Sequence, residues 1–188
     1  PSPTMSIVNS TTEICSNNLV NITLNSPTSG AIITLTGINY NGVVGTLTSP
    51  RNYIPGSVIS ETLINNTTGT ITVTYSFTVA GNGCFNSTTF STTVDVKPIP
   101  VITNTALQLQ QNICSGTTLN FLPTSTTDPG TTYTWTSNTS GTFTGLSASG
   151  SGAITDTPVN TTNVIGYIIY TITPHLNGCS GVPVNYVV

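Results

Sequence analysis

Residues 71–79 read ITVTYSFTV, in which every second residue is apolar and the others are Thr or Ser. Successive side chains of a β-strand point to opposite faces of a sheet, so this stretch would present one apolar face and one hydroxyl-rich face. That is the pattern of an antiparallel strand with one side against a core and the other toward water. The stretch therefore predicts an all-β domain around it.

The same pattern occurs twice in the chain. The tripeptide ICS at residues 14–16 returns at 113–115, and NGC at residues 82–84 returns at 177–179. The intervals are just under one hundred residues, which is the size of a common domain. The chain of 188 residues is therefore expected to hold two tandem modules.

A Pro-x-Pro linker marks the boundary between the modules. PSP opens the chain, and PIP recurs at residues 98–100, directly after the closing strand expected for the first module. Proline fixes φ and favours extended backbone, which suits a short, semi-rigid joint. We predict modules at residues 1–97 and 98–188, with the final strand of the second module truncated at Val188.

Turn signals divide the rest of the chain into short alternating stretches. The signals include Asn41-Gly42, Asn82-Gly83 and Asp128-Pro129-Gly130. Strands of this length, separated by such turns, are typical of a β-sandwich. Besides residues 71–79, the expected strands are residues 19–24, 31–37, 42–47, 90–96, 117–122, 131–137, 141–146, 164–173 and 184–188.

Composition excludes several classes of partner. Charged residues make up 4% of the chain, against about 25% in ordinary soluble domains. Arg51 and Lys97 are the only cations and the net charge is −3, so the basic surface that nucleic-acid binding needs is missing. No apolar run reaches the length of a membrane helix. We expect no nucleic-acid partner and no membrane insertion, with 40 Thr, 20 Ser and 20 Asn keeping the surface polar.

The four cysteines fall as one pair in each module, and none shows the C-x-x-C spacing typical of zinc or redox sites. We predict the disulfides Cys15–Cys84 and Cys114–Cys179, each closing one module. On the chain-entropy model each bond would stabilise its module by about 4 kcal/mol. Disulfides persist in oxidising surroundings, so an extracellular location is expected.

Several short motifs resemble a known family when taken in order. They are YTWT at residues 133–136, YTITP at 170–174, NGCSG at 177–181 and the Pro-x-Pro linker. Together they resemble the cysteine-containing PKD-like (immunoglobulin-like) repeats of very large Bacteroidota surface adhesins, including gliding-motility adhesins. The resemblance covers essentially the whole chain and implies two tandem immunoglobulin/PKD-like β-sandwich modules, export by type IX secretion and service as a stalk or adhesive repeat. The WDFGDG segment of PKD domains proper is absent, which fits the PKD-like branch.

Four large side chains are expected in the two cores. Trp135 is the only tryptophan and could form a platform for sugar stacking, but its counterpart in the first module is Leu35. A position that accepts either residue is most simply a core position. By analogy with immunoglobulin sandwiches, the indole should pack near the disulfide of its module. Tyr75 and Tyr170, at matching places in the two long strands, are the other core residues.

No catalytic or metal-binding constellation is evident. His175 is the sole histidine, expected in the loop before Cys179, and no G-x-S-x-G elbow accompanies it. Glu61 and Asp156 are the only carboxylates that match between modules, and side-chain-to-backbone bonding in turns is their expected role. Asp128 stands alone, whereas calcium needs several converging oxygens. We expect no enzyme activity, no cofactor and no metal.

These observations predict a non-catalytic repeat segment of a long extracellular cell-surface adhesin or filament, acting as a stalk or adhesive array. Its partners would be neighbouring modules of the same chain, together with surface polysaccharide or another cell. Two alternatives remain open. The modules could be spacers in a secreted multidomain hydrolase, or a glycan-binding module that uses Tyr40, Tyr53 or Phe143.

Two modes of assembly follow from the truncated strand. In a continuous array the parent chain would run past Val188 into another linker and module, with each module contacting only its neighbours. In the rival assembly, Pro1–Asn9 of one chain would complete the sheet of the next chain by strand addition.

Overall fold

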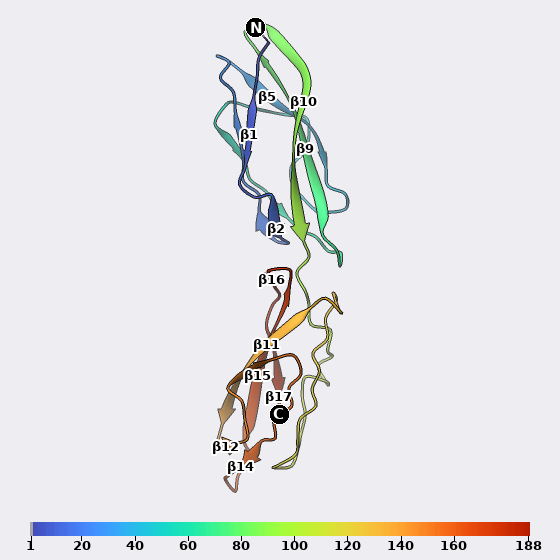
Figure 1. Ribbon diagram of the computed structural model, residues 1–188, viewed down its shortest axis with the longest axis vertical. Helices are drawn as coiled ribbons and strands as arrows, with labels where there is room; N and C mark the ends of the chain where they lie inside the picture. Colours follow the sequence, from blue (N-terminus) through green and yellow to red (C-terminus); the bar gives the residue numbers. More distant parts are fainter. Residues whose placement is uncertain (1) are drawn as a thin grey trace. The chain divides into compact units, whose positions relative to one another are not determined.

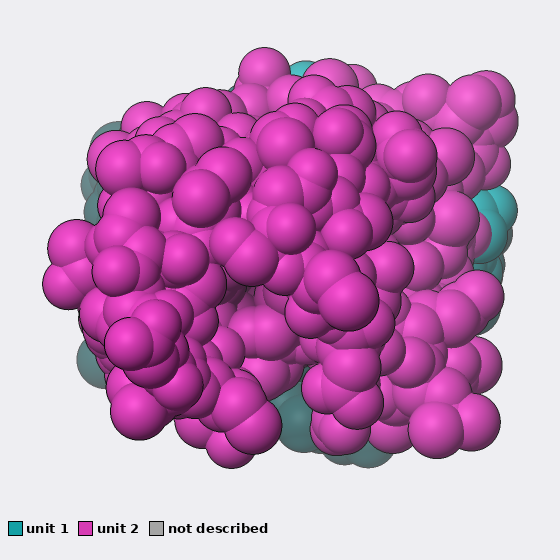
Figure 2. All heavy atoms as spheres, turned by 90° about the horizontal axis from the view of Figure 1, so that it is seen from below, with its two compact units in different colours: residues 1–98 teal, residues 99–188 magenta. Residues whose placement is uncertain are grey.

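The computed structural model describes residues 2–188, which form β-strands, turns and loops. The chain separates into two compact units, Pro1–Pro98 (unit 1) and Ile99–Val188 (unit 2), coloured teal and magenta in Figure 2. Each unit has its own strands (Figure 1) and its own hydrophobic core. The predicted all-β fold of two tandem sandwich modules is confirmed.

Unit 1 packs a three-stranded sheet, in the order β1-β4-β7, against a five-stranded sheet, in the order β2-β10-β9-β5-β6. A further pair joins β3 and β8. Strand β1 belongs to the segment considered above for strand exchange, and it pairs antiparallel with β4 of its own unit; Pro1 of that segment lies outside the described residues. The strands are β1 (Ser6–Asn9), β2 (Glu13–Cys15), β3 (Asn18–Leu19), β4 (Ile22–Asn25), β5 (Ile32–Asn39), β6 (Arg51–Tyr53), β7 (Ser57–Ile59), β8 (Thr62–Leu63), β9 (Ile71–Gly81) and β10 (Cys84–Lys97).

Unit 2 repeats this plan with fewer regular strands. Its main sheet has the order β13-β11-β15-β16, with β17 also on β15, and β12 pairs with β14. The counterpart of the three-stranded sheet is reduced to bridges such as Phe121 to Ile154, so the strand predicted at residues 117–122 is wrong. The strands are β11 (Thr132–Ser140), β12 (Phe143–Thr144), β13 (Ser149–Ser151), β14 (Val159–Asn160), β15 (Tyr167–Leu176), β16 (Cys179–Ser180) and β17 (Val184–Val187).

Asn-Gly turns join the long strands, as the sequence predicts. Asn82 and Gly83 have φ of 53° and 73°, and they connect β9 to β10 by the two-residue hairpin that pairs Gly81 with Cys84. In unit 2, Asn177-Gly178 connects β15 to β16 in the same way. Positive φ at both central residues is the requirement of a type I′ turn, whose twist matches that of the strands it joins.

The strand predicted at residues 42–47 is absent except for a single bridge between Val44 and Ile64. The backbone N–H groups of Thr46 and Leu47 donate to the side chain of Glu61 instead of to a neighbouring strand. The Glu61 carboxylate thus takes the place of a neighbouring strand. The alternation of apolar and polar residues in the sequence gives no sign of this.

Both predicted disulfide pairings are wrong. Cys84 and Cys114 are free, exposed thiols, whereas Cys15 and Cys179 are each disulfide-bonded. In unit 1, Cys84 begins β10 and Cys15 pairs with Lys97 at the other end of the same strand. At a rise of about 3.3 Å per residue the two cysteines lie about 40 Å apart, whereas a disulfide needs Cα atoms within about 7 Å. The modules are therefore not closed by one internal disulfide each.

The same separation holds in unit 2. Cys179 pairs with Leu176 at the end of β15, while Cys114 lines a groove together with Tyr167 at the start of β15. The length of β15 puts about 30 Å between the two positions. Both modules therefore carry their first and second cysteines at opposite ends of the sandwich.

Candidate functional site

Titratable side chains do not gather into a metal site in the described part of the chain. Within residues 2–188, no group of three or more His, Cys, Asp or Glu side chains is placed to hold an ion. None of these residues forms a helix with the length and hydrophobicity of a membrane span. Carboxylates that accept hydrogen bonds from tyrosine hydroxyls occur in both units.

Glu61 is the most extensively bonded of these carboxylates, and it is only 3% exposed in unit 1. It accepts hydrogen bonds from the hydroxyls of Tyr75 at 2.6 Å and Tyr40 at 2.9 Å. The backbone N–H groups of Thr46 and Leu47 donate to it at 2.7 and 3.0 Å. Four protein donors thus replace the water that a charged group needs. The carboxylate ties the segment before β6 to Tyr75 in the middle of β9.

Asp156 has the same role in unit 2. It accepts a hydrogen bond from the Tyr170 hydroxyl at 2.9 Å, and both the N–H and the hydroxyl of Ser147 donate to it at 3.0 and 2.9 Å. Side-chain-to-backbone bonding, predicted for both acids, is confirmed. The contacts with tyrosine were not predicted, although one signal for them exists. In each module the acid precedes its tyrosine by 14 residues.

These contacts keep the phenols protonated. Burial, followed by the hydrogen bond to Glu61, raises the pKa of Tyr75 and of Tyr40 far above the ordinary value. Burial and the bond to Asp156 do the same for the pKa of Tyr170. A phenol that stays protonated donates a hydrogen bond and cannot act as a base near neutral pH. The acid–tyrosine pairs therefore hold the sandwiches together, with the phenols kept as hydrogen-bond donors.

Asp128 is likewise occupied by protein donors. The Tyr133 hydroxyl donates to its two oxygens at 2.8 and 2.9 Å, and the N–H of Ser125 donates at 2.7 Å. Burial raises the pKa of Tyr133 to about 12, with the Ser125 hydrogen bond opposing that shift and Asp128 adding to it. The lone carboxylate thus organises its own turn.

Trp135 lies in the core of unit 2, only 6% exposed, and its counterpart Leu35 is fully buried in unit 1. Its ring meets Tyr170 edge-on with centroids 5.4 Å apart, and a Cβ at Gly150 would come within 2.3 Å of the indole. The expected packing beside a Cys114–Cys179 bond is wrong, since Cys114 is free. The indole Nε1 has no hydrogen-bond partner in the described residues. Tyr75 and Tyr170 are fully buried as well.

His175 lies within β15, so its expected place in a loop is wrong. One ring nitrogen is 2.9 Å from the Ser180 hydroxyl and the other is 2.8 Å from the Thr134 hydroxyl. A catalytic triad needs a carboxylate on the nitrogen that faces away from the serine. Here the Thr134 hydroxyl occupies that place. The contact between His175 and Ser180 therefore lacks the carboxylate that orients the imidazole and stabilises the imidazolium in a triad.

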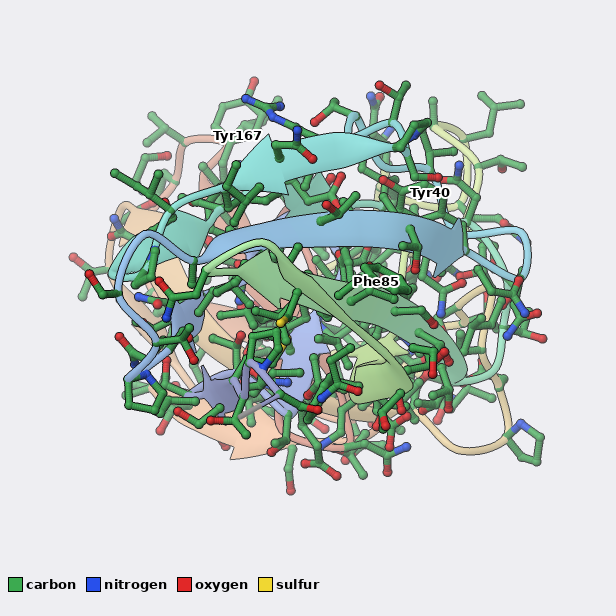
Figure 3. All side chains as sticks on the ribbon, turned by 90° about the horizontal axis from the view of Figure 1, so that it is seen from above. Tyr40, Phe85 and Tyr167 are labelled. Carbon is green, nitrogen blue, oxygen red and sulfur yellow. The ribbon has the colours of Figure 1, made fainter. Side chains whose placement is uncertain are left out.

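The aromatic residues considered for glycan binding are not the exposed ones. Tyr40, Tyr53 and Phe143 are all half-buried, and all three pack against the cores of their units. The aromatic side chains that face solvent are Phe85 at 65% exposure and Tyr167 at 55%. Figure 3 labels Phe85 and Tyr167 together with Tyr40. Tyr40, Tyr53 and Phe143 were expected to be exposed, and that expectation is wrong because their side chains face the cores of their units.

Unit 2 contains a groove of about 740 Å³ at the end that carries the free thiol, which we call the Cys114 groove. The segment Asn112–Cys114 and residues 164–167, before and at the start of β15, both line it. Phe143 and Val188 line it as well. The segments that line this groove are distant in sequence, so no local pattern predicts it.

The chain aligns with several solved structures at low sequence identity. The chain aligns over 100% of its length with 95% of DIP-gamma IG1+IG2, at 8% identity and a TM-score of 0.39. It aligns over 98% of its length with 96% of a Salmonella enterica SafA pilin–SafB chaperone structure, at 9% identity and a TM-score of 0.37. It aligns over 99% of its length with 60% of the Yersinia pseudotuberculosis adhesin InvE, at 13% identity and a TM-score of 0.27.

Sequence comparison identifies the family. No curated protein matches the chain in sequence. The model of the PKD-like domain matches residues 12–100 and again residues 111–188, so each half of the chain carries one match. The two matches cover most of the chain and coincide with the two repeats. The chain therefore belongs to the PKD-like domain family and carries its domain twice in tandem.

Proposed function

We propose that this chain is a non-catalytic repeat segment of a long extracellular cell-surface adhesin or filament, in which it serves as a stalk or adhesive array. The observation that carries the proposal is the tandem itself, in which two PKD-like domains follow one another through the PIP linker. Repeated domains multiply reach or binding surface, whereas a catalytic site needs only one copy. Motility by gliding and export by type IX secretion belong to the same proposal, on the resemblance of the motifs.

The chemistry of the chain supports this role. The acid–tyrosine pairs are structural, and the ring nitrogens of His175 contact hydroxyls. The disulfide-bonded state of Cys15 and Cys179 suits an oxidising, extracellular location. The outward-facing positions of the long strands carry mainly Thr and Ser, which hydrate well without charge.

Antibody fragments against this segment test the proposal on intact cells of the source organism. We expect them to label unpermeabilised cells, to lose their target after surface proteolysis and to reduce attachment of the cells to surfaces. Labelling that required permeabilisation would contradict the extracellular location. Attachment that was unaffected by saturating fragments would contradict the adhesive role.

A further inference from the structure

We propose that unit 1 carries a binding site for a uronic acid residue of an acidic polysaccharide, centred on Arg51. The carboxylate of the sugar would lie against the guanidinium of Arg51, a sugar hydroxyl would accept from the amide of Asn52, and the apolar C–H face of the ring would cover Ile54. The inference rests on the proposed adhesive function and deepens it, since it names a class of ligand and the residues that would bind it.

The site is a pocket of about 310 Å³ at the edge of the five-stranded sheet of unit 1, where β6 is the last strand. The turn from β6 to β7 gives it a fixed backbone. The N–H of Ser57 donates to the carbonyl of Ile54 at 3.1 Å, and Gly56, which follows Pro55, has φ of 89°. Proline followed by a glycine with positive φ is typical of a type II turn. The residues that line the pocket are Ile32, Arg51, Asn52, Tyr53, Ile54 and Ser57.

Arg51 is a cation that remains available to a ligand. Lys97, the other cation of the chain, pairs with Glu13 at 2.7 Å, whereas Arg51 makes no ion pair within residues 2–188. The Cζ atom of Arg51 lies 5.5 Å from the centroid of the Tyr53 ring, and Tyr53 packs against the core of unit 1. This contact orients the guanidinium without using its N–H donors. The exposed guanidinium can therefore donate two parallel hydrogen bonds to one carboxylate.

A neutral donor and an apolar surface lie beside this charge. The Thr34 hydroxyl donates to the side-chain oxygen of Asn52 at 2.9 Å. The amide nitrogen of Asn52 donates to no group among residues 2–188, and Asn52 is exposed. Ile32 and Ile54 are 47% and 69% exposed. A sugar ring has hydroxyls on its rim and C–H groups on its faces, so it can use both the free N–H groups and the exposed apolar surface.

Unit 2 shows that the edge strand forms without these side chains. Strand β13 pairs with β11 as β6 pairs with β5. Trp135 lies opposite Gly150 where its counterpart Leu35 lies opposite Arg51. Residues 150–152 of unit 2, which read GSG, therefore stand at the position of residues 51–53 of unit 1, which read RNY. The charge, the amide and the ring are thus particular to unit 1.

These features together favour a uronic acid over other ligands. The pocket brings one cation, which balances the single charge of a carboxylate. A neutral sugar would make no use of that charge. An acidic peptide could use it, but the pairing of a peptide backbone with a strand edge would serve β13 of unit 2 equally well. A uronic acid residue uses the guanidinium, the amide and the apolar surface at the same time.

The test measures binding of polygalacturonate, a polymer of uronic acid, to the full chain immobilised at high density, where many weak contacts add up. The fully methyl-esterified polymer has the same sugars without the charge, and we expect it to bind at least tenfold more weakly. Arg51→Gln should weaken binding of polygalacturonate about tenfold, because it removes two charge-assisted hydrogen bonds. Arg51→Lys keeps the charge but not the fork of donors, so it should recover only part of the affinity. Lys97→Gln is the matched control, since it removes a cation outside the pocket, and it should leave binding unchanged.

Asn52→Ala keeps every charge and should weaken binding about threefold, which tests the neutral part of the site. The unfolding temperature of each variant checks that unit 1 stays folded. Absence of binding to polygalacturonate, or equal weakening by Arg51→Gln and Lys97→Gln, would overturn the proposal. Equally tight binding of dextran sulfate or of poly-glutamate would also overturn it, because the site would then select any polyanion or an acidic peptide.

Failure here and failure of the proposed function give different results. A chain that binds no polyuronate, but whose antibodies label intact cells and reduce their attachment, loses this site and keeps its adhesive role. Labelling that requires permeabilisation refutes the adhesive role whatever polysaccharide the purified chain binds.

Discussion

Replacing Glu61 with alanine should destabilise unit 1 by about 3 to 4 kcal/mol. The largest part comes from Tyr75, whose hydroxyl loses a 2.6 Å hydrogen bond at a site with 0% exposure. A buried donor left without a partner costs about 1 to 3 kcal/mol. Tyr40 keeps its bond to the carbonyl of Leu47, and Thr46 is exposed to water, so these two groups add less. Removing the buried side chain leaves a small cavity that adds about 1 kcal/mol.

Asp156→Ala in unit 2 is the matched comparison. Asp156 is half-buried, so water can replace part of its hydrogen bonding, and we expect a loss of about 1 to 2 kcal/mol. Glu61→Gln keeps one acceptor oxygen for Tyr75 and should cost less than Glu61→Ala.

Hydrogen exchange measured by mass spectrometry resolves the two units, because peptides from β9 report on unit 1 and peptides from β15 report on unit 2. Glu61→Ala should accelerate exchange in β9 and leave β15 unchanged. Equal effects of Glu61→Ala and Asp156→Ala on their own units, or a loss below about 1 kcal/mol for Glu61→Ala, would refute the reasoning that burial sets the magnitude.

Three further predictions use other features of the chain. Tyrosine in the unfolded chain ionises from about pH 10, whereas Tyr170 in the folded unit keeps its proton. The stability of unit 2 should therefore fall above pH 10, by up to about 1.4 kcal/mol per pH unit for each such phenol. Urea unfolding followed by Trp135 fluorescence at pH 7, 9.5 and 11 checks this, and a flat profile would contradict it. Gly150→Ala would place a methyl group within 2.3 Å of the Trp135 ring. It should destabilise unit 2 by about 1 to 3 kcal/mol and shift the fluorescence emission of Trp135. Unchanged emission and stability would show that the indole has room for the methyl group. Native protein should react with two equivalents of a thiol reagent, at Cys84 and Cys114, and with four after reduction and unfolding; a native count of zero or four would contradict the assigned thiols.

Alternation predicted the long strands because a half-buried sheet leaves a period of two in the sequence. The stretch at residues 71–79 lies wholly within β9, and the stretch at 164–173 overlaps β15 with an offset of three residues at its start. The offset arises where Val164 and Ile165 are apolar but exposed, so apolar character there does not signal a strand. The Asn-Gly turns were predictable because their chemistry is local.

Contacts between distant segments were not predictable in this way. The predicted cysteine pairing was wrong because it followed the order of residues along the repeat. The length of β10 places Cys15 and Cys84 at opposite ends of unit 1. The strand at residues 42–47 failed because Glu61, outside that segment, takes its backbone N–H groups. The acid–tyrosine pairs left a weak signal in their equal spacing, which gains meaning only when both modules are compared.

The near absence of charged residues has a consequence for the salt concentrations at which this protein stays folded. Lys97–Glu13 is the one ion pair among residues 2–188, and it lies at the surface of unit 1. Dissolved salt shortens the reach of electrostatic forces from about 10 Å at 0.1 M to about 3 Å at 1 M. The rest of the cohesion comes from apolar contacts and from hydrogen bonds at contact distance, including those to the carboxylates of Glu61 and Asp156, so screening has little to weaken. The folded state should therefore be almost the same in fresh, brackish and marine surroundings.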